Sequence, residues 1–515
     1  MLRVFSFPVF LGALLVAGLM ITVRLNFHST LTDSSASPQI SIFEGDTWWH
    51  LTMGERILQT HNWPMQETDS FTAHGGEWID SEWLGEVAMA LAERLGGVRG
   101  LAVLLVVLAS TILVLTYYSA YLRTGGAEAA FLACVVLSPL MGVSFTLRPQ
   151  LFGYIFLLLT LTLLERFRAG RQKRLWLLPL IFLLWVNTHP TFVYGYLLLA
   201  LFLICGQLNF SVGGVRSQAW QPAERCHLLL VTLLSTLALP LNPYGGRLVA
   251  YLARVALDQP LILASLQEWR PLPFDEFYGK LFLVLLLGFL LAALTLRQVY
   301  RLEEFILLVS TAWLACMHLR FLILFAIIFA PLLAGLLVVW VPPHQSSQDR
   351  HLLNAVLMTL IAAGVVAFMP SRQTLDAVIA RGFPVGAVEY LRADPLDQPM
   401  FNDYLWGGFL TRSLGTRHKV FIDGRADVYE PAGVLADYLH ITRLDGDPLP
   451  LFRKYGVESC LITPGQPLAT FLANSPGWRK IYADDLSVVF VHESRTSGPR
   501  GGERLESGTR GPDHE

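Results

Sequence analysis

Residues 101–122 read LAVLLVVLASTILVLTYYSAYL and contain no charged side chain. A helix needs about 20 mainly apolar residues to cross a bilayer, so this stretch by itself predicts a membrane-spanning helix. Ten further apolar runs precede residue 370. We therefore predict a polytopic α-helical membrane protein with about eleven spans, at 4–23, 101–122, 127–145, 150–166, 175–187, 191–208, 227–242, 280–297, 303–317, 321–341 and 352–369.

The composition of all 515 residues agrees with this interpretation. The chain is 53% apolar and 15% charged, whereas an ordinary soluble domain is about 25% charged. The 38 Lys and Arg nearly balance the 40 Asp and Glu, so the net charge of -2 offers no basic surface for nucleic acid. Five cysteines without a CxxC pair predict neither a disulfide scaffold nor a cysteine metal site.

The basic residues of the short loops predict the orientation. They collect on one side of the predicted spans, and loops rich in Lys and Arg normally stay in the cytoplasm. They are Arg3, Arg123, Arg166, Arg168, Arg171, Lys173, Arg174, Arg216, Arg225, Arg297, Arg301 and Arg350. Eleven spans then place the amino terminus inside, and segment 24–100 and everything after 370 outside. We interpret the first span as an uncleaved anchor, with a signal peptide cut near Ser34-Ser35-Ala36 as the alternative.

The chain changes character after the membrane domain, which we assign to residues 1–370. Residues 371–493 predict an extracytoplasmic α/β domain, with strands at Val420-Phe421-Ile422 and Cys460-Leu461-Ile462 and helices at 376–393 and 431–440. Residues 494–515 contain almost no apolar side chain and predict a disordered tail.

Polar residues gather in the predicted outer loops. The candidates for binding or catalysis are Asp46, Trp48, Trp49, His50, Asp69, Asp80, Glu82, Arg148, Asn187, His189, Asn242, Tyr244, Glu268, His318 and Arg320. A charge near bilayer depth is costly unless it faces a cavity or a partner, so Arg148 and Arg320 are functional candidates. Either one alone could instead reach toward lipid phosphate. Together with His189 and His318, they favour a shared anion site.

Asp46 has two interpretations. It precedes the amphipathic stretch 47–60, and a lone Asp in that place is more often a helix N-cap than a catalyst. The adjacent Trp48 and Trp49 suit both a membrane belt and a sugar-stacking wall. Asp80 and Glu82 extend the set of carboxylates. A solvated charge is the simpler interpretation for Asp69, and also for Glu82 and Glu86, which lie one helical turn apart.

The last candidates lie in the predicted α/β domain and among the histidines. Arg425 follows a predicted strand and is a candidate for acceptor contact or for docking onto the membrane domain, whereas Asp423 suits a turn. His50, His189 and His318 come from three loops and lack the short spacing of a zinc site. We therefore predict no required cofactor, and the ligand spacing does not support a divalent metal.

Several motifs resemble those of a known superfamily. These are Asp46-Thr47-Trp48-Trp49-His50, Leu147-Arg148-Pro149-Gln150, Trp185-Val186-Asn187-Thr188-His189, Leu241-Asn242-Pro243-Tyr244-Gly245, Asn402-Asp403-Tyr404-Leu405-Trp406-Gly407-Gly408 and Phe421-Ile422-Asp423-Gly424-Arg425. With the multi-span body and the outer carboxy-terminal domain, the chain resembles GT-C integral-membrane glycosyltransferases over residues 1 to 492, within a bacterial group of multi-pass membrane proteins. The resemblance implies that an acidic residue of the first outer loop is the catalytic base or a metal-facing group, and this role falls on Asp46. Many GT-C enzymes have paired acids there, whereas Thr47 follows here.

The resemblance and the chemistry of the outer face imply one function. No nucleotide sugar is supplied there, so a transferase would take its sugar from a polyprenyl-phosphate donor and pass it to an envelope glycan, lipid or protein acceptor on the bacterial inner membrane. Asp46 would remove the acceptor proton with help from His50, and Arg148 and Arg320 would stabilise the departing phosphate. A transporter or flippase of a lipid-linked glycan, or a catalytically silent scaffold for envelope assembly, are the alternatives.

Overall fold

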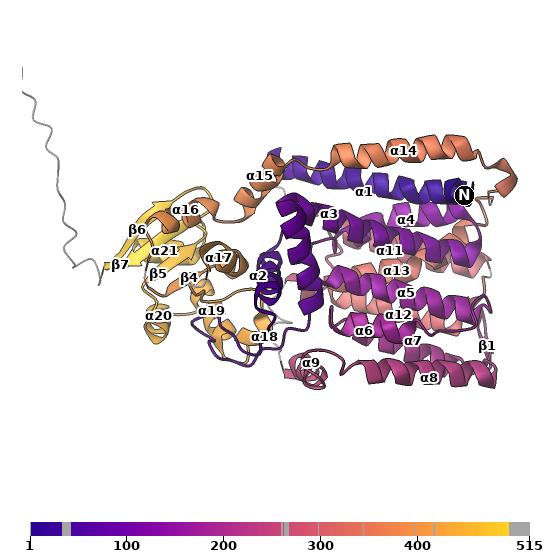
Figure 1. The fold of residues 1–515 in the computed structure, drawn as a ribbon, viewed down its shortest axis with the longest axis horizontal. Helices are drawn as coiled ribbons and strands as arrows, with labels where there is room; N and C mark the ends of the chain where they lie inside the picture. The colour runs from indigo at the N-terminus through magenta and orange to yellow at the C-terminus, as the bar shows by residue number, and fades with distance from the viewer. Residues whose placement is uncertain are drawn as a thin grey trace, which may run out of the picture.

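The computed structural model describes residues 2–32, 43–258, 261, 267–296, 298–342, 344–396, 398–415 and 418–493. The predicted cleavage site at Ser34-Ser35-Ala36, Arg297 and the predicted tail 494–515 lie outside these residues. Long, nearly parallel helices form a bundle, and a smaller α/β domain lies at one end of it, with the short helix α2 (Gly45–Thr60) between the two (Figure 1).

A helix occurs at each of the eleven predicted spans. These helices are α1 (Phe7–Thr32), α3 (Trp83–Thr124), α4 (Ala127–Gly142), α5 (Gln150–Arg168), α6 (Leu178–Val186), α7 (Phe192–Cys205), α8 (Pro222–Ala238), α11 (Phe277–Leu296), α12 (Leu302–Met317), α13 (Leu322–Leu337) and α14 (His351–Phe368). Within the described ranges, 6 helical segments are long and apolar enough to cross a bilayer: the segment Phe7–Asn26 of α1, α3, α5, α11, Leu319–Leu337 and α14. The chain is thus a multi-pass membrane protein, and the number of crossings stays a prediction.

The burial of the helices follows from their composition. α13 is apolar on every face, and most of its side chains are buried against α3, α4 and α12. A helix of this kind belongs in the interior of a bundle. α14 is similarly apolar, but Asn354 is its only buried residue among those described, and it packs along α1. Its exposed apolar surface suits contact with lipid tails.

Short strands close the end of the bundle that is remote from the α/β domain. β1 (Phe210–Val212) pairs antiparallel with β2 (Val215–Ser217), and β2 pairs in parallel with β3 (Tyr300–Arg301). β1 and the amino terminus lie at this same end in Figure 1. The sheet therefore connects the loop after α7 with the loop before α12.

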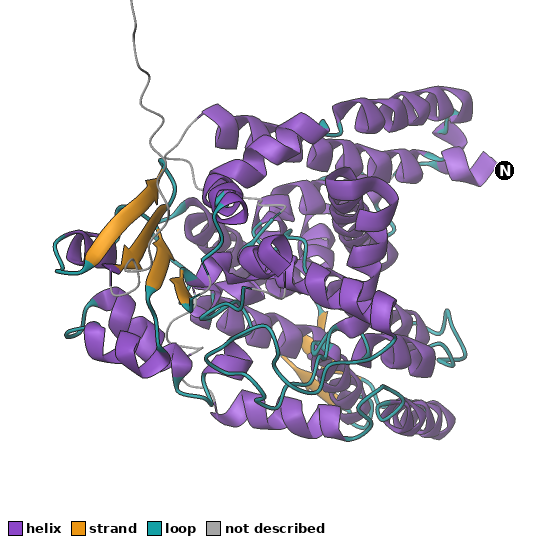
Figure 2. Cartoon of the chain, turned by 60° about the vertical axis from the view of Figure 1, so that its left-hand side comes forward, coloured by secondary structure: helices purple, strands orange, loops and turns teal. Residues whose placement is uncertain are grey.

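The α/β domain contains a four-stranded sheet in the order β4-β5-β7-β6 (Figure 2). Its strands are β4 (Met400–Asn402), β5 (Ser459–Ile462), β6 (Trp478–Ala483) and β7 (Val488–His492). β4 and β5 are parallel, whereas β7 is antiparallel to both β5 and β6. The predicted strand at Cys460-Leu461-Ile462 is thus confirmed within β5.

The helices of this domain follow the predicted ranges with one break. They are α15 (Arg372–Gly382), α16 (Val385–Ala393), α17 (Gly407–Leu414), α18 (Ala426–Tyr429), α19 (Val434–Arg443), α20 (Leu449–Tyr455) and α21 (Pro467–Ala473). The helix predicted at 376–393 is divided by Phe383 and Pro384, because proline disfavours the helical conformation of the residue before it. The helix predicted at 431–440 corresponds to α19.

The predicted strand at Val420-Phe421-Ile422 is wrong. Val420 forms only isolated bridges, with Met400 and Ser70. Beyond it, the side chain of Asn402 takes the place of a neighbouring strand: its Oδ1 accepts from the Phe421 backbone N–H at 2.8 Å, and its Nδ2 donates to the Ile422 carbonyl at 2.8 Å. The backbone is satisfied without a ladder, so the apolar run does not form one.

The α/β domain is joined closely to residues 43–82, which precede α3. The Val420 backbone N–H donates to the Asp69 carbonyl at 3.0 Å, and Phe71 donates back to the Val420 carbonyl at 3.2 Å. α17 packs on α2. A Cβ atom at Gly408 would lie 2.7 Å from the Gly45 carbonyl oxygen, so the pair Gly407-Gly408 permits close helix packing. This places the start of α2 directly beneath the α/β domain.

Candidate functional site

A cavity of about 230 Å³ lies where the membrane helices, segment 43–82 and the α/β domain meet. Most of the predicted site residues line it, although they come from separate segments of the chain. Those residues are Asp46, Trp49, His50, Asp80, Glu82, Arg148, His189, Glu268, Arg320 and Arg425. The predicted shared cavity for Arg148 and Arg320 is confirmed, and it includes Asp46.

Asp46 reaches this cavity because it is not the helix cap. The N-cap of α2 is Glu44, whose side chain forms a capping box with Thr47, and Asp46 is the second residue of the helix. The prediction that Asp46 caps the helix is therefore wrong. Its Oδ1 accepts from Trp49 Nε1 at 3.2 Å, and its Oδ2 lies 3.1 Å from Arg148 Nη2. Both carboxylate oxygens are held on the cavity side.

Glu268 joins the two arginines. Its Oε2 lies 3.3 Å from Arg148 Nη1, and its Oε1 lies 3.3 Å from Arg320 Nη1. Arg148 also pairs with Glu44. Arg320 stacks over Trp269, with the guanidinium carbon 4.3 Å from the ring centroid. The two guanidinium groups are thus held side by side within reach of one anion.

Burial and neighbouring charges set the protonation of this group. Burial raises the pKa of Asp46 to about 6; Arg148 opposes this rise, and Glu268 and Glu44 add to it. Burial would lower the pKa of Arg148, but the carboxylates of Asp46, Glu44 and Glu268 hold it well above its ordinary value. Two arginines therefore face three carboxylates, and protonation of Asp46 makes the cluster neutral.

Two histidines lie on either side of Glu82. His189 Nε2 lies 3.3 Å from Glu82 Oε1, and His50 Nε2 lies 3.6 Å from Glu82 Oε2. The Thr191 backbone N–H donates to His189 Nδ1 at 3.1 Å, so the neutral ring has its proton on Nε2 and donates it to Glu82. Burial lowers the pKa of His189 to about 3 and that of His50 well below its ordinary value. Both rings are neutral at physiological pH.

Two carboxylates lie beside His50: Glu86 is buried, whereas Glu82 is half-buried and lines the cavity. His50 Nδ1 lies 2.8 Å from Glu86 Oε1, and Glu86 is completely buried. Burial raises the pKa of Glu82 well above its ordinary value, and Asp80 and Asp46 add to the rise. The prediction of a solvated charge is therefore wrong for Glu86, and Glu82 faces the cavity in contact with two histidines. A histidine between two carboxyl groups can hold or relay a proton.

Arg425 has a structural position at the wall of the cavity. It pairs with Asp423 and Glu67, each at 2.5 Å, and its guanidinium carbon lies 4.8 Å from the Trp78 ring centroid. These contacts join the α/β domain to segment 43–82, which agrees with the docking interpretation. Asp69 is also buried and pairs with Arg56 at 2.5 Å, so its interpretation as a solvated loop charge is wrong.

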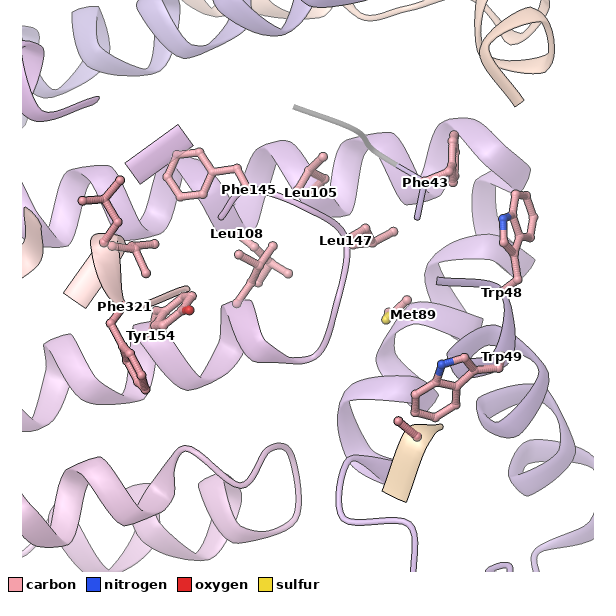
Figure 3. Packing of buried hydrophobic residues seen from close by; sticks show 14 of the residues in the cluster. Phe43, Trp48, Trp49, Met89, Leu105, Leu108, Phe145, Leu147, Tyr154 and Phe321 are labelled. Carbon is pink, nitrogen blue, oxygen red and sulfur yellow. The ribbon is translucent and has the colours of Figure 1, made fainter. Parts of the chain in front are cut away.

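Trp48 lies outside the cavity although it adjoins Trp49. Its ring packs in the core against Phe43, Phe383 and Phe409, with centroids 5.1 to 5.5 Å apart. Figure 3 shows the two tryptophans on different sides of α2. Successive side chains of a helix diverge by about 100°, so only one of them can face the cavity. The prediction that Trp48 contacts substrate is therefore not supported.

Four other predicted residues bond within the fold and do not line the cavity. Asn187 donates to the Leu241 carbonyl at 3.1 Å and accepts from Trp83 Nε1 at 3.0 Å, and the Asn242 side chain closes the turn around Tyr244. The other two residues donate to backbone carbonyls: Tyr244 to Pro64 at 2.9 Å, and His318 to Trp269 at 2.6 Å.

The cavity also contains residues that the sequence analysis did not select. Tyr251, on α9 (Arg247–Asp258), donates its hydroxyl to Asp427 Oδ2 at 2.8 Å. Gln150 and Trp78 also line the cavity. Gln150 adjoins Arg148 in a motif already quoted, whereas α9 has no comparable signal. Among the described residues, no group of three or more His, Cys, Asp or Glu side chains could hold a metal ion, and independence from metal stays a prediction.

We expect Gly424→Ala to reduce function without comparable loss of stability. A Cβ atom there would collide with Asp46 Oδ1 and lie 3.1 Å from Trp49 Nε1. Because displacement of a reacting group by about 1 Å can cost up to 10² in rate, activity should fall at least about tenfold. Complementation and the melting temperature measure the two effects. Gly465→Ala is the control, because a Cβ there meets no atom within 4 Å. Equal activity of both variants would contradict the close contact between residue 424 and the Asp46 carboxylate.

No protein-family model and no curated protein matches the sequence. Among solved structures, the archaeal oligosaccharyltransferase AglB from Archaeoglobus fulgidus, in complex with an inhibitory peptide and a dolichol-phosphate, aligns with a TM-score of 0.51 at 11% identity, over 88% of this chain and 69% of that one. ArnT from Cupriavidus metallidurans bound to undecaprenyl phosphate aligns with a TM-score of 0.47 at 13% identity, over 94% and 99%. The similarity to AglB shows that the chain shares the fold of that structure, which confirms the predicted fold class of a polytopic helical protein with a carboxy-terminal α/β domain.

Proposed function

We propose that this protein is a GT-C-type glycosyltransferase that moves a sugar from a polyprenyl-phosphate donor to an envelope glycan, lipid or protein acceptor on the outer face of the bacterial inner membrane. One observation carries the proposal: Asp46, with its pKa raised to about 6, shares a cavity with two arginines joined by Glu268. The complex of AglB with a dolichol-phosphate supports the donor class, because that structure has the same fold.

The proposed reaction is a displacement at the anomeric carbon of the sugar. Asp46 takes the proton of the acceptor hydroxyl, whose oxygen forms the new bond to the anomeric carbon. The bond from that carbon to the donor phosphate oxygen breaks, and the polyprenyl phosphate leaves with the electron pair. Arg148 and Arg320 stabilise its charge, and the phosphate replaces Glu268 and Glu44 as their partner.

Glu82 and the two histidines suit the acceptor side of the cavity. Glu82 accepts a hydrogen bond from His189 Nε2 and lies beside His50. Because both rings are neutral, they add no charge that would attract the donor phosphate away from the arginines. We assign them the positioning of the acceptor hydroxyl toward Asp46. Trp49, whose ring lies beside His50, offers an apolar face for a sugar.

A second, largely apolar cavity between the membrane helices suits a prenyl tail. It measures about 440 Å³ and is lined by α1, α3, α4, α11 and the loop residue Phe145. Phe145, which lines this cavity, lies only three residues before Arg148 in the sequence. The lining of the cavity is thus connected through a short loop to one of the two arginines. A donor could thus enter laterally from the bilayer with its phosphate directed to Arg148.

We expect Gly18→Leu to obstruct this entry. A Cβ atom at Gly18 meets nothing within 4 Å, and the residue lines the apolar cavity, so leucine would fill space without displacing protein. The KM for the lipid donor should rise about tenfold while kcat changes little. Gly364→Leu on α14 is the matched control, because it also has open space but lies outside the cavity. If both variants keep the wild-type KM, the prenyl tail of the donor does not bind in the cavity lined by Gly18.

We expect activity to fall as the pH decreases below about 6. A base acts only when ionised, and the pKa of Asp46 is raised to about 6, so kcat/KM should be constant above this pH and decrease tenfold per unit below it. His50 and His189 do not explain such a limb, because burial lowers the pKa of each below this range. The residual activity of Asp46→Asn should not decrease in this way below a pH of about 6. The same decrease in that variant would mean that another group, not Asp46, titrates there.

Analysis of the lipids of a deletion strain tests the function directly. A transferase deletion should accumulate a polyprenyl-linked sugar, and the wild-type gene, but not one encoding Asp46→Asn, should remove it. The purified protein in vesicles should then release polyprenyl phosphate from that lipid when the acceptor is added. Movement of the lipid between leaflets without cleavage would support a flippase. Complementation by Asp46→Asn would support a scaffold.

A further inference from the structure

A second charged cavity lies at the opposite end of the bundle. It measures about 120 Å³, and its walls come from α3, α5, α12, α13 and β3. Arg301 on β3 places it beside the small sheet, whose strand β1 lies far from the α/β domain in Figure 1. None of its residues lines the candidate active site.

The cavity has an excess of positive charge. Four arginines line it, namely Arg123, Arg166, Arg171 and Arg301, against the carboxylates Glu165 and Glu304. Arg301 pairs with Glu165 at 2.5 Å, and Arg123 pairs with Glu304. Both carboxylates are therefore already paired, and Arg166 and Arg171 have no charged partner among the lining residues.

Arg166 and Arg171 are held by neutral groups instead. Arg166 Nη1 donates to the Tyr118 hydroxyl at 2.7 Å, and Arg171 Nη1 donates to the Leu122 carbonyl at 3.1 Å. The Arg166 Nε atom is buried and has no hydrogen-bond partner in the described structure, and the same holds for Thr162 Oγ1. Buried polar atoms are normally satisfied, so unpartnered atoms in a cavity wall indicate a missing ligand or solvent.

Most of the remaining wall of the cavity is apolar, although Ser119 and Thr162 add hydroxyl groups. The larger apolar residues are Leu122, Leu161, Leu307, Ile328, Pro331 and Leu332. A free, fully hydrated anion gains nothing from such a wall, whereas the glycerol and first acyl carbons of a lipid bury apolar area there. The cavity thus combines forked cationic donors at a helix end with an apolar surface inside the bundle.

We infer that this cavity binds a phosphate-bearing anion, namely the phosphate group of a membrane phospholipid. Guanidinium groups donate paired hydrogen bonds that match phosphate oxygens, which a lysine cannot reproduce. Arg166 and Arg171 supply these donors, and the apolar wall receives the start of the acyl chains. The site is independent of the proposed transfer reaction, because it shares no residue with that cavity and lies at the opposite end of the bundle.

The test measures lipid binding by the full-length protein in an uncharged detergent. Native mass spectrometry would follow titration with phosphatidylglycerol, with diacylglycerol as the lipid without phosphate, and with inorganic phosphate as the soluble source. We expect tight binding of phosphatidylglycerol only. Replacement of both Arg166→Gln and Arg171→Gln should weaken it at least about tenfold, because both forked donors are lost.

The matched control replaces Arg174→Gln and Arg225→Gln, which removes two positive charges outside the cavity. This control should bind phosphatidylglycerol as the wild type does. Arg166→Lys keeps the charge and therefore the fold, and should still weaken binding severalfold. Unchanged affinity in Arg166→Lys and in the double variant would overturn the site. Equal binding of diacylglycerol would also overturn it, and equal binding of inorganic phosphate would overturn the lipid as its occupant.

Discussion

Asp46→Asn is expected to lower glycosyl transfer by about 10² or more, the usual contribution of a positioned base. The protein should fold normally, because Glu44 rather than Asp46 caps α2. The amide oxygen of asparagine can still accept from Trp49, and Arg148 retains Glu44 and Glu268 as partners. The variant loses the capacity to take a proton and the ion pair of Asp46 with Arg148, while the other partners of Arg148 remain. Initial rates with the lipid donor and the melting temperature of the same preparation measure both quantities.

The matched control for this experiment is Asp376→Asn on α15. It makes the same chemical change at an exposed carboxylate, which pairs with Arg372 at 3.6 Å on the surface. Its transfer rate should equal that of the wild type. If folded Asp46→Asn transferred sugar at nearly the wild-type rate, Asp46 would have no role as a base, and the proton would have to go to another group such as Glu82.

The second large effect is expected for Arg320→Lys. Lysine keeps the positive charge but loses the forked donors, and it also loses the flat surface that Arg320 presents to Trp269. A hydrogen bond to a charged group contributes about 1.5–3 kcal/mol, and each 1.4 kcal/mol corresponds to about a factor of ten. We therefore expect kcat/KM for the lipid donor to fall by about 10 to 10². Arg148→Lys should act in the same way.

Arg254→Lys provides the control for the arginine variants. Arg254 pairs with Glu77 at 3.0 Å, but its side chain is 56% exposed, and exposed pairs contribute little. Its kinetics should match those of the wild type. If both Arg320→Lys and Arg148→Lys kept the wild-type kcat/KM, the two arginines would not bind the donor phosphate. This conclusion would hold even if Asp46→Asn proved inactive.

The sequence predicted the helical body well, because the signal for a membrane helix is local. A run such as 101–122 has enough apolar side chains to form a helix in a bilayer, whatever its neighbours are. The same local logic found the strand at Cys460-Leu461-Ile462. It failed at Val420-Phe421-Ile422, because the remote side chain of Asn402 supplies the hydrogen bonds that a strand would need.

The sequence also identified most of the polar residues of the site, because charges beside apolar spans are costly and therefore conspicuous. It could not assign their partners. Glu86 has the same local pattern as a solvated helix charge, and only the packing of α2 against α3 shows that it is buried beside His50. By residue type, Trp48 and Trp49 are equally suitable for contact with a sugar. The α/β domain, however, covers Trp48 and leaves Trp49 in the cavity.

The sequence by itself determined which segments are helical and which residue types lie between them, since both depend on neighbours within a few turns. The tertiary structure alone decided that Asp46, Arg148, Glu268 and Arg320 form one cluster. These residues come from four separate segments of the chain, and their distances depend on how helices far apart in the chain pack together. The raised pKa of Asp46 depends on the same packing, because burial causes it.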